Sequence, residues 1–376
     1  MIYLDYNSTT KIAPEVLAKM LEAYQLPLNN SATHQLGRKA NKFVEDAKGE
    51  IEDFLNAKNY ETIFTGSSSE ATNTVFFGTD VEVILFSKTE HNSVYNCRPS
   101  DKKIVEIEVL ENGLIDFSDL EKKLEEIFVS RGSGKFLISV MLAHNETGVI
   151  QDVEKIAKLA HQKGGLMHCD IVQAAGKIAV DLEKLNVDFA SISAHKLQGP
   201  QGVGALLMRK GLDIKPLILG GKQQKSKRAG TLNIAGIAGF GEACKLAKNN
   251  LKNYEAVKKL RDFLEEEIQK ITKDAKDDIK NFDSTVARLP NTSYIGLCGV
   301  DSQTQLINFD LNGICVSAGA ACSSGTVAES RVLKAMKVAP EFSNSAIRVT
   351  LGPDNNKEEI EKFILVWSEF YKKMKQ

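Results

Sequence analysis

The chain has 376 residues, with 48 Lys and Arg, 49 Asp and Glu, and a formal net charge of -1. Proteins that bind nucleic acids usually carry a clear basic excess, so no nucleic-acid partner is expected. No apolar run approaches the roughly 18 residues of a membrane helix, so no membrane association is expected. The N-terminus lacks a signal-peptide pattern, and the six cysteines form no CxxC pair. We therefore expect a cytoplasmic enzyme of two or three domains.

Short apolar runs alternate with amphipathic segments between about residues 60 and 245. This alternation predicts an α/β fold with a mostly parallel sheet covered by helices. In such sheets ligands bind beyond the carboxyl ends of the strands, so the loops at those ends are candidate sites. A helix is predicted at 153–163, and strands are predicted at 62–65, 81–87, 135–141, 165–169, 189–193 and 203–208.

The pattern changes after residue 245. Apolar residues then recur every three or four positions with charged residues between them, which predicts a long linking helix at about 241–272. We expect this helix to join a large domain, residues 14–245, to a smaller α+β domain formed by residues 1–13 and 246–376. A last helix is predicted to begin near Asp354.

Polar residues follow two of the predicted strands. After strand 189–193, Lys196 could form a Schiff base with an aldehyde cofactor, although most single lysines are solvated surface residues. Asp170 ends strand 165–169 and is either a helix cap or a carboxylate that keeps a pyridine nitrogen protonated. Gln173 could reach the phenolic oxygen of such a cofactor.

Two more segments begin where strands end. Ser68 and Ser69 lie between a predicted strand and a predicted helix, where free backbone N–H groups suit a phosphate, although a plain serine N-cap fits equally well. Ser193 and His195, beside the lysine above, could also hold an anion. His91 could stack on a flat cofactor and transfer protons.

One cysteine has an unusual setting. Cys322 lies in a run of small residues with a glycine on each side, so no large side chain buries it. We expect a mobile loop at about 315–330 and a thiol that acts as a nucleophile.

Together these segments resemble a cysteine desulfurase of the NifS/IscS type, in the class V aminotransferase family. The resemblance runs from the segment 3–10 to the segment 346–352 and covers five separate motifs. It implies a fold-type I enzyme that depends on pyridoxal 5'-phosphate (PLP) and converts L-cysteine to L-alanine and an enzyme persulfide. It also implies a homodimer and a sulfur-acceptor protein, such as an iron–sulfur cluster scaffold or a tRNA thiolation protein.

The resemblance assigns roles by position. Lys196 becomes the Schiff-base lysine, His91 the ring-stacking histidine, and Cys322 the persulfide-bearing residue and a transient iron–sulfur ligand; no intrinsic metal site is implied. Asn145 and Arg348 are assigned to the substrate carboxylate, and Thr231 to the phosphate of the neighbouring subunit. The implied cofactor contacts are Ser68, Ser69, His91, Asn145, Asp170, Gln173, Ser193, His195, Lys196 and Thr231.

Some positions depart from the family pattern. The phosphate loop 65–70 reads TGSSSE where the family usually has TSGxTE, and His144 stands where a first Asn is common. The stretch 222–228 is unusually basic, which suits either a solvated loop or a docking patch for an acidic partner.

Three other functions stay open at this point. A selenocysteine lyase or cysteine C–S lyase of the same fold would use the same cofactor. A sulfur-relay scaffold would lack catalytic residues that this chain retains. A nucleotide-binding protein would need a GxGxxG motif that opens a helix, whereas the glycines at 199, 202 and 204 have another spacing.

Overall fold

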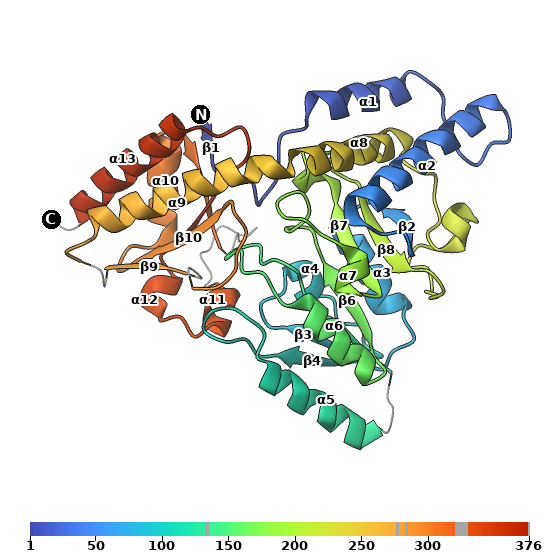
Figure 1. Cartoon of the computed structure of the whole chain (residues 1–376), viewed down its shortest axis with the longest axis horizontal. Helices are drawn as coiled ribbons and strands as arrows, with labels where there is room; N and C mark the ends of the chain where they lie inside the picture. Colours follow the sequence, from blue (N-terminus) through green and yellow to red (C-terminus); the bar gives the residue numbers. More distant parts are fainter. Residues whose placement is uncertain (132–134, 276–277, 283–284, 320–329, 375–376) are drawn as a thin grey trace.

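A seven-stranded sheet forms the centre of the larger part of the molecule (Figure 1). The computed structural model describes residues 1–131, 135–275, 278–282, 285–319 and 330–374. The strand order is β2-β8-β7-β6-β5-β3-β4, in which β8 is antiparallel to both neighbours and all other pairs are parallel. The predicted α/β fold with a mostly parallel sheet is confirmed. The strands are β2 (Tyr60–Thr65), β3 (Val83–Ser87), β4 (Lys103–Ile107), β5 (Phe136–Ser139), β6 (Leu166–Asp170), β7 (Phe189–Ser193) and β8 (Gly204–Arg209).

Helices cover both faces of this sheet because successive strand residues point to opposite sides. Ile84 and Leu137 pack in one core with α3, whereas Leu85 and Ile138 pack in a second core with α2, α6 and α8. The helices around the sheet are α1 (Pro14–Tyr24), α2 (Gln35–Leu55), α3 (Ser68–Gly78), α4 (Asn92–Tyr95), α5 (Phe117–Arg131), α6 (Val153–Gln162), α7 (Leu182–Leu185) and α8 (Ile234–Asn250).

The remainder of the chain forms a smaller unit around a four-stranded antiparallel sheet of order β12-β13-β10-β9. The N-terminal strand joins this end of the molecule, since β1 pairs in parallel with β11. A third core around Trp367 fills the space between the sheet and its helices. The elements are β1 (Ile2–Tyr3), β9 (Ile279–Asn281), β10 (Thr292–Leu297), β11 (Ile314–Cys315), β12 (Ser317–Ala318), β13 (Ala346–Thr350), α9 (Tyr254–Ile271), α10 (Ser302–Leu311), α11 (Arg331–Ala335), α12 (Pro340–Ser343) and α13 (Lys357–Met374).

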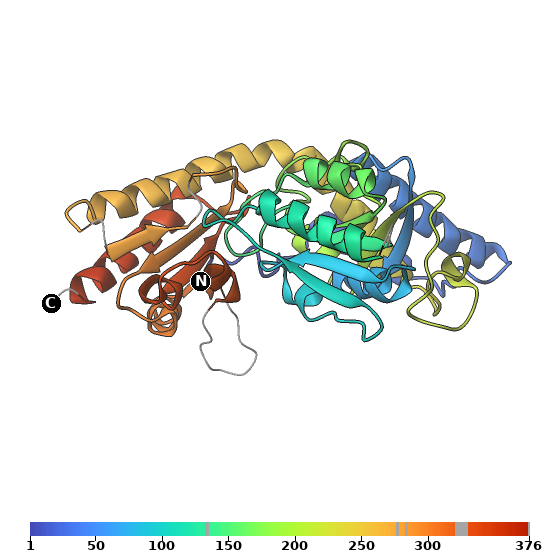
Figure 2. The same ribbon diagram turned by 90° about the horizontal axis from the view of Figure 1, so that it is seen from below.

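The predicted linking helix at 241–272 is wrong in its bounds. Helix α8 begins at Ile234, and a 3₁₀ turn, η3 (Leu251–Asn253), separates it from α9, so two helices run along the two parts of the molecule (Figures 1 and 2). The turn follows two asparagines, Asn249 and Asn250, and ends at a third, Asn253. Asparagine is a poor helix former, so these residues favour a break in the helix. The domain boundaries at residues 13 and 245 stay predictions.

Two other boundaries differ from the sequence prediction. The cysteine loop was predicted at 315–330, and its predicted first residue is too early in the chain. Ile314–Cys315 and Ser317–Ala318 form strands instead. The last helix begins at Lys357 rather than near Asp354. In the described part of the chain, no helix combines the length and apolar character that a membrane span requires.

Candidate functional site

A cavity of about 210 Å³, here called the strand-end cavity, lies where parallel strands and the N-terminus of α3 meet. Every predicted cofactor-binding residue except Thr231 lines it, because the parallel strands end at the same edge of the sheet. Its lining residues are Ser67, Ser68, Ser69, His91, Met141, Ala143, Asn145, Asp170, Val172, Gln173, Ser193, His195 and Lys196.

The N-terminus of α3 forms one wall of the cavity. Ser67 is the N-cap, and its hydroxyl accepts a hydrogen bond from Glu70 N at 3.1 Å. The next two residues, Ser68 and Ser69, therefore start the helix with N–H groups that lack intrahelical acceptors. A Cβ on Gly204 would lie 2.7 Å from Ser67 C and 3.0 Å from Ser68 N. Only glycine at this position lets the helix start approach β8 so closely.

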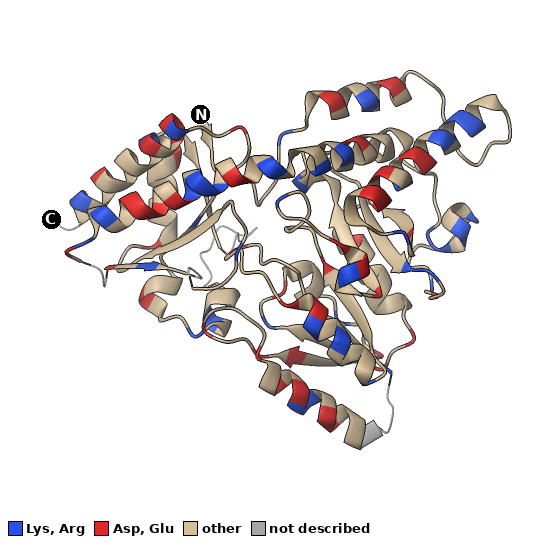
Figure 3. Ribbon diagram, in the orientation of Figure 1, with Lys and Arg blue, Asp and Glu red and all other residues tan. Residues whose placement is uncertain are grey.

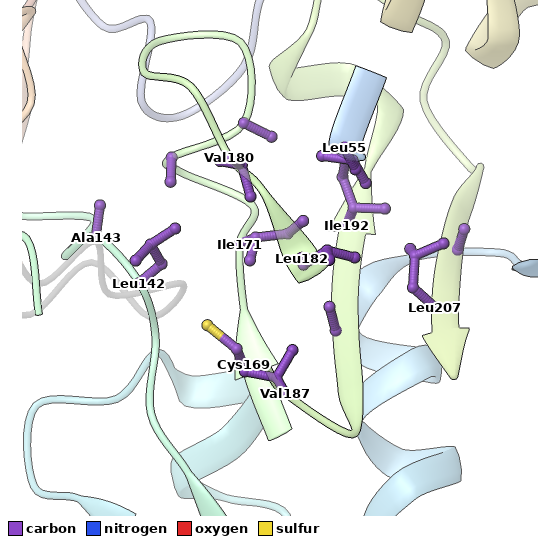
Figure 4. Close-up of a cluster of buried hydrophobic side chains, with 14 of the residues drawn as sticks. Leu55, Leu142, Ala143, Cys169, Ile171, Val180, Leu182, Val187, Ile192 and Leu207 are labelled. Atoms are coloured by element: carbon purple, nitrogen blue, oxygen red, sulfur yellow. The ribbon is translucent and has the colours of Figure 1, made fainter. Parts of the chain in front are cut away.

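Asp170 reaches the cavity from the end of β6. Strand alternation places its neighbours Cys169 and Ile171 in the core, where Figure 4 shows them beside Val187 and Ile192. Its Oδ1 accepts a hydrogen bond from Val172 N at 2.9 Å. Burial nevertheless raises the pKa of Asp170 to about 6, so a cationic partner would stabilise its ionised form.

Lys196 enters the cavity from the short turn after β7, η1 (Ala194–Lys196). Its Nζ donates to the carbonyl oxygens of Asn7 at 2.6 Å and Ser8 at 2.5 Å. Burial, followed by the positive charge of Arg348, lowers the pKa of Lys196 to about 8. The amine is therefore partly neutral, and nucleophilic, near neutral pH.

His91 is the N-cap of α4, and its Nδ1 accepts a hydrogen bond from Ser93 N at 3.1 Å. This contact places the ring proton of the neutral form on Nε2. Although part of the side chain is exposed, loss of hydration around the ring and the nearby Lys196 charge lower the pKa of His91 to about 4. The ring is neutral at pH 7 and can accept or donate a proton.

His195 lines the cavity from the same 3₁₀ turn as Lys196. Its Nδ1 lies 3.1 Å from Thr9 Oγ1, and its carbonyl oxygen accepts a hydrogen bond from Thr10 N at 3.0 Å. Desolvation, followed by the charge of Lys196, lowers the pKa of His195 to about 4. A neutral imidazole beside Ser193 can still donate one hydrogen bond to an anion.

A second cavity of about 340 Å³, here called the arginine cavity, adjoins the first and shares four lining residues with it: His91, Asn145, Gln173 and Lys196. The Arg348 guanidinium, which lines only the second cavity, donates to Asp5 Oδ1 at 2.8 Å and to Asn145 O at 3.0 Å. The Nε atom of Arg348 is buried without a partner among the described residues. The arginine is thus held in place at the wall of the cavity, where its positive charge suits an anionic ligand.

His144, the departure from the family pattern, is a buried structural residue. Its Nε2 donates to Thr89 O at 2.8 Å, while its Nδ1 accepts from the backbone N–H groups of Glu146 and Thr147. Burial lowers the pKa of His144 to about 4, which keeps it in the neutral form that these contacts require. The residue therefore fixes the loop before His91 without lining either cavity.

Three polar residues near the cavities received no role from the sequence. Asn7 accepts the Lys196 hydrogen bond, and Glu90 lines the arginine cavity with an unpartnered buried carboxyl oxygen. Lys177 is buried and contacts both Asn7 and Gln173. A lone lysine four residues after Gln173 in an apolar stretch was the only sequence signal for it.

The basic stretch 222–228 includes the 3₁₀ turn η2 (Gln223–Ser226). Three of its cations have acidic partners: Lys225 with Glu61, Lys227 with Asp213, and Arg228 with Glu70 at 2.8 Å. Elsewhere too, basic and acidic residues are interspersed along the helices (Figure 3). These pairs favour the interpretation of 222–228 as a solvated loop.

Two predicted site residues lie away from the cavities. Thr231 is exposed on the outside of its own chain, so a role toward a neighbouring subunit stays a prediction. Cys322 lies outside the described residues, and its role as nucleophile stays a prediction. Within the part of the chain that the structure describes, no three His, Cys, Asp or Glu residues cluster as a metal site.

The chain is similar over nearly its whole length to known enzymes. Residues 2–363 match the family model described as aminotransferase class-V. A cysteine desulfurase IscS from Dictyoglomus turgidum is 38% identical, with 96% of this chain and 91% of the relative covered. Cysteine desulfurase 2 from Trichormus variabilis is 34% identical over 97% of this chain and 91% of its own.

Solved structures are similar as well. A NifS-like protein from Rickettsia africae superposes with a TM-score of 0.89 and 37% identity, and 99% of each chain is covered. A structure described as SspA in complex with cysteine has a TM-score of 0.76 and 25% identity, covering 94% of this chain and 99% of its own.

Proposed function

Because the chain belongs to the aminotransferase class-V family, whose members depend on PLP, we propose that the strand-end cavity holds this cofactor and that the arginine cavity receives L-cysteine. The protein is a cysteine desulfurase, which leaves L-alanine and transfers the sulfur to an enzyme thiol. The observation that carries this proposal is the convergence of Lys196, Asp170 and His91 on one cavity at the start of α3.

The residues of the cavity fit each part of the cofactor. The N-terminus of α3, with Ser68 and Ser69, suits a phosphate because of its free N–H groups and positive dipole end. Asp170 suits a protonated ring nitrogen, which would offset the burial that raises the pKa of this carboxyl group. The Lys196 amine is within the same cavity and suits the aldehyde.

Each residue then has a defined task. When bound, PLP supplies an aldehyde for the lysine and a ring that accepts an electron pair from the substrate. Arg348 binds the substrate carboxylate, and Lys196 removes the proton from Cα. Asp170 keeps the ring nitrogen protonated, and His91 moves protons beside the ring.

Sulfur transfer completes the reaction. The Cys322 thiolate attacks the substrate sulfur, so that an S–S bond forms and the Cβ–S bond breaks. A proton is added at Cβ, which gives alanine, and Cys322 retains the sulfur as a persulfide. Atoms balance, because one cysteine and one thiol become one alanine and one persulfide.

Three further points belong to the proposal. The enzyme acts as a homodimer, in which the exposed Thr231 of one chain contacts the phosphate held by the other. The persulfide sulfur passes to an acceptor protein, such as an iron–sulfur cluster scaffold or a tRNA thiolation protein. A cytoplasmic location suits a reactive thiol, because reducing conditions keep it free.

Two variants test the proposal. PLP-loaded wild-type protein should be yellow, with a visible absorbance band that borohydride abolishes. Lys196→Ala should lack this borohydride-sensitive band. Cys322→Ser should keep the band but release no sulfide from L-cysteine under reductant.

The same experiment separates the related activities. A selenocysteine lyase or a C–S lyase forms no enzyme persulfide, so Cys322→Ser would continue to turn over. Sustained turnover in Cys322→Ser would therefore contradict the desulfurase mechanism, whereas mass-spectrometric detection of one added sulfur on Cys322 would support it.

A further inference from the structure

Lys177 is a buried lysine that none of the tasks above uses. Its exposed fraction is 3%. Its Nζ donates to Asn7 Oδ1 at 2.8 Å and to Gln173 Oε1 at 2.6 Å. No carboxylate in the described part of the chain forms an ion pair with it. Burial lowers the pKa of the Lys177 amine well below its ordinary value, and a lysine amine buried among neutral partners costs free energy, so the residue needs a functional explanation.

The contacts of Lys177 determine which end of the Gln173 amide faces the cavity. Because Oε1 accepts from Lys177, the Nε2 group points the other way and donates to Asn7 O at 2.9 Å. The same carbonyl oxygen accepts from Lys196 Nζ at 2.6 Å. The reversed amide would place its NH₂ group against the donors of Lys177, which is unfavourable.

Hydrogen bonds also fix the orientation of the Asn7 side-chain amide. Its Nδ2 donates to Thr292 Oγ1 at 3.0 Å, and its Oδ1 accepts from Asn291 Nδ2 at 3.1 Å in addition to Lys177. Both acceptors of Lys177 therefore have one defined amide orientation. The network keeps the N–H side of Gln173 next to Lys196.

We propose that Lys177 is a positioning residue, which holds the Gln173 amide so that its Nε2 group donates to the cofactor oxygen beside Lys196. This inference rests on the proposed function, because it requires the cofactor in the strand-end cavity. The charged groups that act on Lys177 are Lys196 and Arg348, and those that act on Lys196 also include Asp5 and Asp170.

The hydrogen bond from Gln173 to the cofactor oxygen should change the pH at which the Lys196 nitrogen loses its proton. A hydrogen bond donated to the neighbouring cofactor oxygen makes that oxygen a weaker partner for the proton on the Lys196 nitrogen. The proton then leaves at lower pH. Loss of the Lys177 donor should release the Gln173 amide and move the pH midpoint of the visible band upward.

The experiment is a spectroscopic pH titration of the PLP-loaded holoenzyme. Lys177→Met preserves the length of the side chain and removes its donors, and we expect its midpoint to rise by about half a pH unit or more. Lys102→Met is the control: Lys102 is a half-buried lysine that donates a hydrogen bond to a backbone oxygen, Thr79 O, and it lies outside both cavities. Its midpoint should equal that of the wild type.

A double-mutant cycle shows whether Lys177 acts through Gln173. In a Gln173→Ala background, Lys177→Met should add less than half of its effect in the wild type. An unchanged midpoint in Lys177→Met, or an equal shift with and without Gln173, would overturn the inference. If Lys177→Met does not fold, Lys177→Leu provides a second donor-free side chain and the same outcomes decide. Absence of any borohydride-sensitive band in the wild type would instead refute the proposed function.

Discussion

The side chains of Lys196 and Arg348, two positive charges, line the same cavity. Arg348 is held there by Asp5, and its charge adds to the burial that lowers the pKa of Lys196 to about 8. The arginine thus serves two purposes, because it offers a site to a carboxylate and makes the neighbouring amine more nucleophilic at neutral pH.

Cofactor uptake by the apoprotein should follow this lowered pKa. Only the neutral amine of Lys196 reacts with an aldehyde, so the uptake rate should rise with pH and reach half of its maximum near pH 8 rather than near 10.5. Arg348→Met should move this midpoint to higher pH, since it removes a charge that lowers the pKa. Stopped-flow absorbance measures the rate, and Arg38→Met, which removes an exposed arginine, is the control. An unchanged midpoint in Arg348→Met would contradict the argument.

Asp170 should make the apoprotein less stable at neutral pH. Its pKa is raised from 3.8 to about 6 by burial, so the folded state binds more protons than the unfolded state between these values, and stability falls as pH rises. Asp170→Asn should remove this loss and be more stable than wild type at pH 7 by about 2–3 kcal/mol. Urea unfolding of both apoproteins at pH 4 and pH 7 measures the difference, which should be much smaller at pH 4. Equal pH dependence of the two proteins would refute the prediction.

His144 should make the protein less stable as the pH decreases, which is the opposite of the effect of Asp170. Its folded-state pKa of about 4 lies below the ordinary value of 6.5, so the unfolded chain binds more protons between these values and stability falls as pH decreases. The wild type should therefore lose about 2–3 kcal/mol relative to His144→Asn between pH 7 and pH 4. Urea unfolding of both proteins at pH 4 and pH 7 tests this. The quantity to compare is the change in the free energy of unfolding between the two pH values, because Asn also changes the hydrogen bonds at every pH. A constant difference would mean that His144 is not buried in the neutral form.

Gly204 should be required for cofactor binding. A Cβ there would collide with the backbone of Ser67 and Ser68, so Gly204→Ala should displace the start of α3 and weaken PLP binding by tenfold or more, which corresponds to about 1.4 kcal/mol. Fluorescence titration of the apoprotein with PLP gives the affinity. Gly49→Ala is the matched control, because no atom lies within 4 Å of its Cβ and the residue is in the interior of α2. This control should bind PLP normally and be stabilised by about 0.5–1 kcal/mol.

The sequence predicted the central sheet well because periodicity and strand ends are local signals. Residues as far apart as Ser68 and Lys196 meet because parallel strands end at one edge, and that rule needs no long-range information. The order of the motifs resembled that of a known family, and this resemblance assigned a role to each site residue. The short strands of the smaller unit, such as Ile314–Cys315 and Ser317–Ala318, have too few residues to show a period.

The supporting residues could not be predicted for another reason. Lys177, His144 and Asn7 act through hydrogen bonds to residues distant in sequence, and no spacing indicates which amide or carbonyl group they reach. The break between α8 and α9 was missed because the apolar period continues through the 3₁₀ turn at Leu251–Asn253. Hydrogen bonds between distant residues, and a short break within a continuous apolar period, leave no signal in the local pattern.

The pairing of the two chain ends bears on how the protein is made. Asn7 is synthesised long before Cys315 and Thr350, yet these two residues fix the backbone around it. Asn7 O in turn receives the hydrogen bonds of Lys196 and Gln173. Contacts of such large sequence separation form late in folding. A nascent chain that has not yet reached Thr350 therefore has no complete site for vitamin B6.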